Sequence, residues 1–206
     1  MSRYPYLPGN VAKHKCKSIL EIGVWAGNTA VQMIKASAQI DDNTDNVYYY
    51  GFDIFEDFIT DSSVGDLKQP PTFNDVNNKL TSTGANIKLF KGNSLDTIPK
   101  FVNENPKLQI DLIFIDGGHA WDVIEADWNN IQPLIHDDTV IIFDDYWTPS
   151  HAWGCNKLVD SLNRSIWDVI VLPNASPGYN HNVGRSIRVA KVTKKAFVLV
   201  VDKNYG

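Results

Sequence analysis

Long apolar runs, cysteine and glutamate are all scarce in this sequence, and each shortage excludes a class of protein. No window approaches the ~18 consecutive apolar residues of a membrane span. The first residues also lack the apolar core of a signal peptide, so we expect a cytoplasmic protein with no membrane segment. Two cysteines, Cys16 and Cys155, are too few for a disulfide framework and match no zinc spacing. We expect both to be reduced, partly buried thiols.

Positive charge is in short supply too, with 19 basic against 24 acidic residues and a net charge of −5. Nucleic-acid binding needs a basic face, so we expect a small-molecule substrate and no nucleic acid. A homo-oligomer is left open. The acids divide into 20 Asp and only 4 Glu. Because Asp favours caps and turns over helix interiors, many of these carboxylates should lie at the ends of helices and strands.

Short apolar runs alternate with stretches of helical spacing along the 206 residues. Strands are expected at 18–23, 47–53, 86–91, 110–116, 139–144 and 167–172, and helices at 27–38, 73–80, 94–102, 121–134 and 153–164. Two further runs, 186–192 and 196–201, are too close for a crossover helix and predict an antiparallel hairpin at the sheet edge. The pattern indicates one domain over 1–206, an α/β doubly wound, mostly parallel sheet with ligands at the strands' carboxyl ends.

The first expected strand runs into a turn with two glycines, Gly23 and Gly27, which let a backbone turn sharply and approach a ligand closely. The G-x-G-x-x-G dinucleotide fingerprint is missing, because Trp25 stands at the second glycine's place. An NAD-type oxidoreductase is therefore disfavoured. Glu21, two residues before the first glycine, suits a cation better than a pyrophosphate. A plain strand-to-helix turn is the alternative.

Polar residues follow the second and third expected strands. Asp53 comes twenty-six residues after Gly27 and could accept hydrogen bonds from both hydroxyls of a ribose. Asn93 and Ser94 are placed to hydrogen-bond a flat heterocycle beside that ribose. Helix capping is the alternative for all three residues.

Two expected buried strands end in acid, and this gives the strongest signal. Asp116 follows one strand, and Asp144 and Asp145 end the other, so three carboxylates should converge and repel one another. A divalent cation would relieve that repulsion, and an all-oxygen shell suits Mg²⁺, Mn²⁺ or Ca²⁺ better than Zn²⁺. The alternative is one helix cap and one pair with Lys or Arg. His119 could accept a proton from a substrate hydroxyl or could only hydrogen-bond the substrate.

In order and spacing, these residues resemble the class I S-adenosylmethionine-dependent methyltransferases from about Ser18 to Tyr146. They are most similar to the branch that holds catechol-type and macrocin-like sugar O-methyltransferases. The resemblance implies a Rossmann-like, seven-stranded sheet with an antiparallel C-terminal edge hairpin. It also implies catalytic roles for His119 and Asp116 and a Mg²⁺, Mn²⁺ or Ca²⁺ site at Asp116, Asp144 and Asp145. The residues that it implies at the cofactor are Glu21, Gly23, Trp25, Gly27, Asp53, Ile54, Asn93, Ser94 and Asp116.

Two departures from the catechol type bear on the substrate. Its members often carry Asn at the position of Asp145, and a lysine base where Trp121 and Asp122 stand here. A sugar or other aliphatic hydroxyl is therefore favoured over a catechol. We expect a metal-assisted O-methyltransferase acting on a sugar-like or phenolic hydroxyl. A metal-independent methyltransferase and a non-catalytic cofactor-binding module are the alternatives.

Overall fold

The computed structural model describes residues 4–57, 69–150, 152–173, 176–177 and 186–195. Its strands are β1 (Ser18–Ile22), β2 (Tyr48–Asp53), β3 (Asn86–Lys91), β4 (Ile110–Ile115), β5 (Ile135–Thr148), β6 (Trp167–Val171), β7 (Ser176–Pro177) and β8 (Ser186–Lys194). Its α-helices are α1 (Tyr6–His14), α2 (Asn28–Ala38), α3 (Phe73–Thr81), α4 (Ser94–Glu104), α5 (Trp121–Ile131) and α6 (Asn156–Ser161). Short 3₁₀ turns cover Phe55–Asp57 and Gln132–Leu134.

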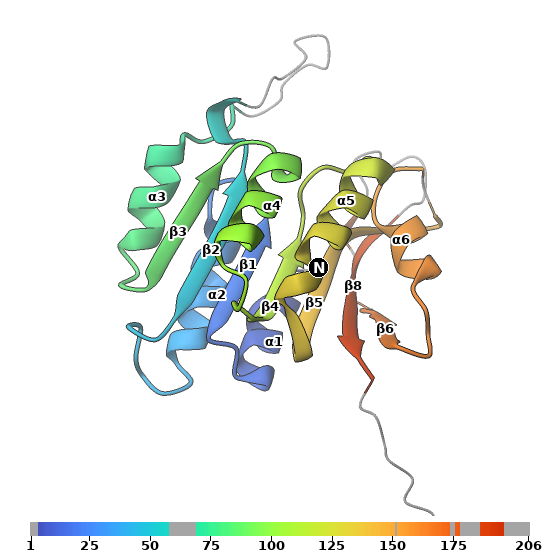
Figure 1. Cartoon of the computed structure of the whole chain (residues 1–206), viewed down its shortest axis with the longest axis horizontal. Helices are drawn as coiled ribbons and strands as arrows, with labels where there is room; N and C mark the ends of the chain where they lie inside the picture. Colours follow the sequence, from blue (N-terminus) through green and yellow to red (C-terminus); the bar gives the residue numbers. More distant parts are fainter. Residues whose placement is uncertain (1–3, 58–68, 151, 174–175, 178–185, 196–206) are drawn as a thin grey trace, which may run out of the picture.

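The strands form one twisted sheet in the order β3-β2-β1-β4-β5-β8-β6, with the two-residue β7 also paired to β8 (Figure 1). The pairs from β3 to β5 are parallel, whereas β8 is antiparallel to both β5 and β6. This confirms the predicted α/β doubly wound, mostly parallel sheet. The antiparallel strand lies between β5 and β6 rather than at the margin, so β6 is the outer strand. The second run of the predicted hairpin, 196–201, lies outside the described residues.

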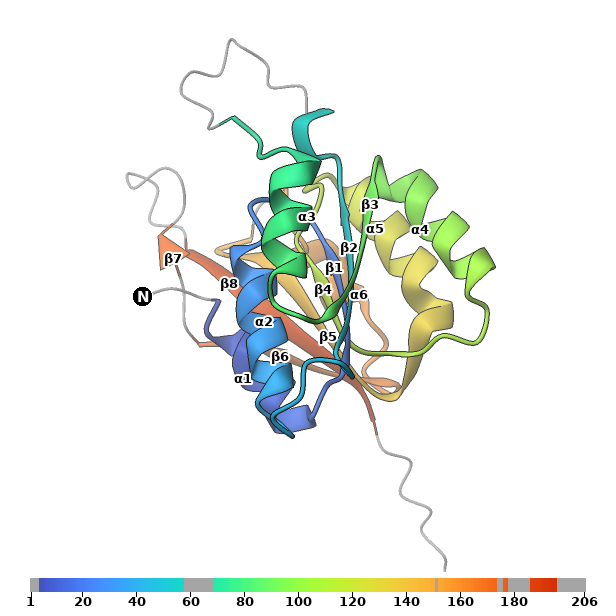
Figure 2. The same cartoon turned by 90° about the vertical axis from the view of Figure 1, so that its left-hand side faces the viewer.

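Helices cover both faces of the sheet, as Figure 2 shows with α1, α2 and α3 on one side and α4 and α5 on the other. Each face buries its own apolar cluster. Leu7, Met33 and Tyr49 belong to the cluster under α1 and α2, whereas Phe52 and Trp128 belong to the cluster under α4 and α5. β4 is apolar toward both faces, because a central parallel strand has helices above and below it.

Three segments differ from the sequence expectation. Helix α1 has no apolar repeat strong enough to predict it and contains Pro8 and Gly9, but it packs on α2, so tertiary contact outweighs low propensity. β5 begins at Ile135, four residues early, because its first residues extend the pairing with β4. Helix α6 is short, since residues before Asn156 form a loop. Both cysteines are free and buried, as expected.

None of the helices among the described residues combines the length and apolar character that a bilayer span requires.

One acid is buried within the sheet itself. Glu21 on β1 is 1% exposed, and its carboxyl group accepts a hydrogen bond from the Tyr49 hydroxyl on β2. Burial raises the pKa of Glu21 to about 8, and the nearby Asp53 carboxylate adds to the rise, while the Tyr49 hydrogen bond opposes it. Glu21 is therefore protonated at neutral pH. Burial and the Tyr49 hydrogen bond leave Glu21 without an exposed negative charge that would attract a cation.

We predict that Glu21→Gln flattens the pH dependence of stability. The folded protein keeps the Glu21 proton up to a pH of about 8, whereas the unfolded chain loses it above its ordinary pKa of 4.5. The free energy of unfolding should therefore fall as the pH rises between these values, by on the order of a few kcal/mol from this group. Urea unfolding at pH 5, 6.5 and 8 measures the free energy of unfolding and its dependence on pH. Exposed Glu104→Gln is the control, and equal slopes in all three proteins would contradict the assignment.

Candidate active site

The turn after β1 lies directly against the turn after β4. The Gly23 N–H donates to the Phe52 carbonyl, and the Asp116 N–H donates to the Ile22 carbonyl, each at 2.8 Å. Gly23 has φ +89°, and a Cβ built there would lie 2.0 Å from the Asp116 carbonyl oxygen. Only glycine satisfies both conditions. The two loops that the sequence assigns to the cofactor and to the acids are thus adjoining parts of one surface.

Asp53 fastens the turn after β1 to the turn after β2. Its Oδ2 accepts the Trp25 N–H at 2.7 Å, and its Oδ1 accepts the Phe55 N–H at 2.8 Å. This holds Trp25 at φ +48°, an uncommon conformation for a bulky residue. Each carboxylate oxygen has a second lone pair, so Asp53 can organise the turn and still accept hydrogen bonds from a ligand. The predicted ribose contact stays a prediction.

Apolar side chains from three neighbouring turns are exposed at this end of the sheet. Trp25 is 44% exposed, Ile54 37% and Leu95 39%. The sequence suggested the first two, while Leu95 was missed, although it directly follows Ser94. Asn93 is the N-cap of α4 and its side chain accepts the Leu95 N–H at 3.0 Å, so the capping alternative holds for Asn93. Exposed apolar groups beside hydrogen-bonding ones suit a flat, polar-edged ring.

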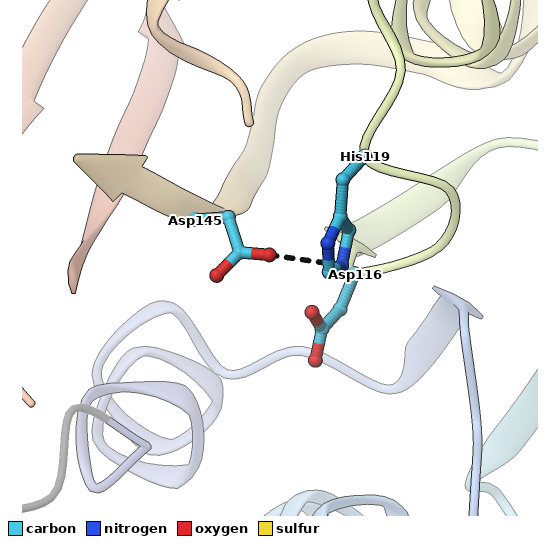
Figure 3. A group of neighbouring side chains, drawn as sticks. All are labelled: Asp116, His119 and Asp145. Carbon is cyan, nitrogen blue, oxygen red and sulfur yellow. Dashed lines mark ion pairs between the residues drawn. The ribbon is translucent and has the colours of Figure 1, made fainter. Parts of the chain in front are cut away.

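Beyond this surface, two acids and a histidine form the acid cluster, defined as Asp116, His119 and Asp145. One ligand atom of each lies within 4.8 Å of the others. His119 Nε2 is 2.9 Å from Asp145 Oδ2, and Figure 3 shows this pair with the Asp116 side chain next to the imidazole. Asp116 and His119 come from the β4–α5 loop, and Asp145 comes from β5. Two oxygen donors and one nitrogen donor can hold a divalent cation.

Asp144 departs from the expected set of three acids, because its side chain is outside the acid cluster. It accepts a hydrogen bond from the Tyr4 hydroxyl, at 3.1 Å to Oδ2. Consecutive strand residues point to opposite faces, and here the β5–β8 register shifts between Phe143 and Tyr146. Asp145 has φ +55°, which redirects its side chain. Asp144 still lines the same small pocket as the acid cluster, so its role as a ligand stays a prediction.

The chain after β5 folds back onto the acid cluster. The Gly154 N–H donates to the His119 carbonyl at 3.0 Å, and the Cys155 N–H donates to the Asp145 carbonyl at 3.2 Å. Cys155 lines the pocket, and its burial together with the nearby Asp144 and Asp145 carboxylates raises the pKa of its thiol well above the usual range. The thiol is therefore protonated at neutral pH.

Sequence reasoning missed three residues here. Tyr4 precedes α1 and joins Asp144 across 140 positions, so no local pattern could have indicated it. Gly154 fell inside the helix expected at 153–164, so it was not considered as a residue of a tight loop. Asp127 did leave a signal, since it stands at helical spacing with Ile124 and Ile131 on the buried stripe of α5.

The strand order and, among the described residues, the antiparallel strand β8 between β5 and β6 are those of a class I methyltransferase fold. The sequence profile of the family described as "Methyltransferase domain" matches residues 20–146, and the chain belongs to this family. An uncharacterised protein of Acanthamoeba polyphaga mimivirus is 28% identical over 88 residues, which are 41% of this chain and 40% of the viral protein.

Solved structures share the fold at low identity. The O-methyltransferase TomG of Streptomyces achromogenes, in complex with S-adenosylmethionine, has a TM-score of 0.64 at 13% identity and covers 94% of this chain and 79% of its own. The calicheamicin methyltransferase CalS11 has a TM-score of 0.60 at 17% identity, and the match covers 90% of this chain and 76% of CalS11. An O-methyltransferase of Bacillus cereus, in complex with S-adenosylhomocysteine, has a TM-score of 0.59 at 15% identity. This match covers 93% of this chain and 80% of the Bacillus cereus chain.

We predict that Gly154→Ala destabilises the protein by about 2–4 kcal/mol, because the methyl group must occupy a left-handed backbone position and a filled space. Gly154 has φ +96°, and a Cβ there would lie 2.2 Å from the Asp145 carbonyl oxygen. Gly9→Ala is the matched control, since a Cβ at Gly9 meets nothing within 4 Å and alanine suits a helix better by about 0.5–1 kcal/mol. Urea unfolding measures both variants. If Gly154→Ala is as stable as the wild type, the close packing of Gly154 against the Asp145 carbonyl group is wrong.

Proposed function

We propose that this protein is an S-adenosylmethionine-dependent O-methyltransferase that acts on a small-molecule hydroxyl with the help of a divalent cation. One observation carries the proposal. In a chain of the methyltransferase family, the turn held by Gly23 and Asp53 directly adjoins the acid cluster. The complexes of TomG and of the Bacillus cereus enzyme with S-adenosylmethionine and S-adenosylhomocysteine support the choice of cofactor.

The cofactor assignment rests on the turns after β1, β2 and β3. Asp53 would accept hydrogen bonds from the ribose hydroxyls through its second lone pairs, while Ile54 and Leu95 would pack against the adenine. Ser94 would face the base from the start of α4. Glu21 would act only through the turn above it, because it is buried and bound to Tyr49. When bound, S-adenosylmethionine supplies a methyl group on a sulfonium centre.

The donor set of the acid cluster fits a divalent cation. Asp116 and Asp145 would provide oxygen ligands, and Asp144 could join them from the same pocket. If His119 bound the cation instead of acting as the base, its nitrogen would shift the preference from Mg²⁺ toward Mn²⁺. Such a cation would polarise the acceptor hydroxyl and ease its deprotonation.

His119 is our candidate for the base that takes the proton of the acceptor hydroxyl. The Asp145 carboxylate, 2.9 Å from Nε2, fixes the orientation and tautomer of the ring. The Gly154 N–H holds the His119 backbone from the other side. Methyl transfer from a sulfonium is an in-line displacement, so most of the catalytic task is alignment and deprotonation. A rigidly held imidazole within the acid cluster suits both tasks.

For the acceptor, we favour a sugar-like hydroxyl over a phenol. CalS11 is described as a TDP-rhamnose 3'-O-methyltransferase. This chain also carries Trp121 and Asp122 where the catechol type has a lysine base. Trp153, 65% exposed and next to Gly154, could stack on a sugar ring. A metal-independent methyltransferase is the second candidate, because the pair between Asp145 and His119 could orient the base by itself.

The test of the cofactor is calorimetric titration with S-adenosylmethionine. We expect micromolar binding to the wild type and a loss of about tenfold to a hundredfold in Asp53→Ala, since a doubly hydrogen-bonded charged group is removed. Asp57→Ala is the matched control, because Asp57 is close in sequence but largely exposed and paired with Lys91. No binding to the wild type would refute the proposed function. Equal affinity in both variants would remove only the ribose assignment.

The metal site is tested by titrating Mn²⁺ in the presence of S-adenosylhomocysteine and following free Mn²⁺ by electron paramagnetic resonance. We expect one saturable site, weakened at least tenfold in Asp145→Asn because an anionic ligand is lost. The exposed Asp122→Asn should bind as the wild type does. If the wild type shows no saturable site, the metal-independent candidate replaces the metal-assisted one.

A further inference from the structure

Asp127 is a buried acid for which the proposed mechanism has no use. It lies on the inner face of α5 and is 0% exposed. Within the part of the chain that the structure describes, neither of its carboxylate oxygens has a hydrogen-bond partner. Buried polar groups nearly always have partners, and a buried carboxylate without one is costly. In the ligand-free protein, Asp127 therefore lacks the hydrogen-bond donor that would offset its burial.

Among the described residues, no positive charge contributes to the pKa of Asp127 or offsets its burial. Burial raises the pKa of Asp127 to about 6, and the nearby Ser94 side chain, which lowers the pKa, is the only other contributor. At neutral pH the carboxyl group is therefore mostly ionised. An apolar residue would fill this place at lower cost. The acid thus weakens the ligand-free fold, which is typical of groups kept for binding or catalysis.

The carboxylate lies under the surface proposed for the adenine. A Cβ built on Gly117, the residue after Asp116, would be 3.7 Å from Asp127 Oδ2. Ser94, whose side chain influences Asp127, begins α4, and α4 packs along α5. Asp127 therefore faces the place where the turns after β3 and β4 meet. The Ser94 side chain influences Asp127 but does not complete a hydrogen bond to it in this ligand-free form.

We propose that Asp127 is a positioning residue for adenine, acting through Ser94. On binding, the Ser94 hydroxyl donates to Asp127, and its oxygen then offers its lone pairs to the exocyclic amine of the base. A hydroxyl has one hydrogen to donate and two lone pairs. When Ser94 donates that hydrogen to Asp127, it can only accept a hydrogen bond from the ligand. The site would then select an amine over a carbonyl at that position of the purine. This inference rests on the proposed function.

The experiment compares two ligands, S-adenosylhomocysteine and its deaminated analogue S-inosylhomocysteine, which carries a carbonyl in place of the amine. Their affinities are measured by calorimetry for the wild type, Asp127→Leu, Asp127→Asn and Ser94→Ala. Asp122→Asn, on the exposed side of α5, is the control. Thermal unfolding of each ligand-free variant is recorded alongside, because a merely structural aspartate and a positioning one differ there.

We expect the wild type to prefer S-adenosylhomocysteine by about tenfold or more, the effect of one hydrogen bond to a charge-oriented hydroxyl. Asp127→Leu and Ser94→Ala should both abolish that preference. Asp127→Asn should keep much of it, because the amide oxygen still accepts from Ser94. The melting temperature of ligand-free Asp127→Leu should equal or exceed that of the wild type, since an unpaired buried charge is removed.

Two results would overturn the inference. One is an unchanged ligand preference in Asp127→Leu. The other is a lower melting temperature in Asp127→Leu with both ligands weakened equally, which would make the aspartate structural. If Asp127→Leu does not fold, Ser94→Ala decides, and a retained preference there refutes the proposal. Wild-type protein that binds neither ligand refutes the proposed function itself, whereas binding without a preference refutes only the role of Asp127.

Discussion

The contact between the turn after β1 and the turn after β4 is the constraint on which the rest of the site depends. Gly23 has no Cβ, so the backbone of β1 can pass against the carbonyl of Asp116. The same residue, Asp116, belongs to the acid cluster. The proposed methyl donor and methyl acceptor are therefore placed relative to each other by paired backbone strands. A rigid sheet can fix such a separation better than side chains on separate loops can.

Buried carboxyl groups are concentrated around this contact, and they differ in protonation state and in their partners. Glu21 keeps its proton and binds Tyr49. Asp145 is 5% exposed and pairs with His119. Asp127 has no partner among the described residues. Together they make this end of the sheet less stable than an apolar one would be, and such local cost is expected where a protein binds ligands.

The sheet and most of its helices could be predicted from the sequence, because buried parallel strands are continuous apolar runs and the helices between them keep a 3.6-residue period. The acids that follow β4 and lie within β5 were found for the same reason. The orientation of Asp144 and Asp145 was not predictable, since it depends on a bulge in the β5–β8 register and on Tyr4, which is 140 positions away. Helix α1 was not predicted because Pro8 and Gly9 lower its helix propensity, and Asp127 was missed because it is a single acid on the otherwise apolar stripe of α5.

The position of β8 has a consequence for biosynthesis. Within the described residues, β6 pairs only with β8, and β8 joins β6 to β5. Chains emerge from the ribosome N-terminus first, at about 5–20 residues per second. The strands from β1 to β5 can therefore pair while translation continues, but β6 must wait as an unpaired apolar strand until residues 186–194 have been made. The protein thus passes through a stage during synthesis in which this part of the sheet is open to association with other chains.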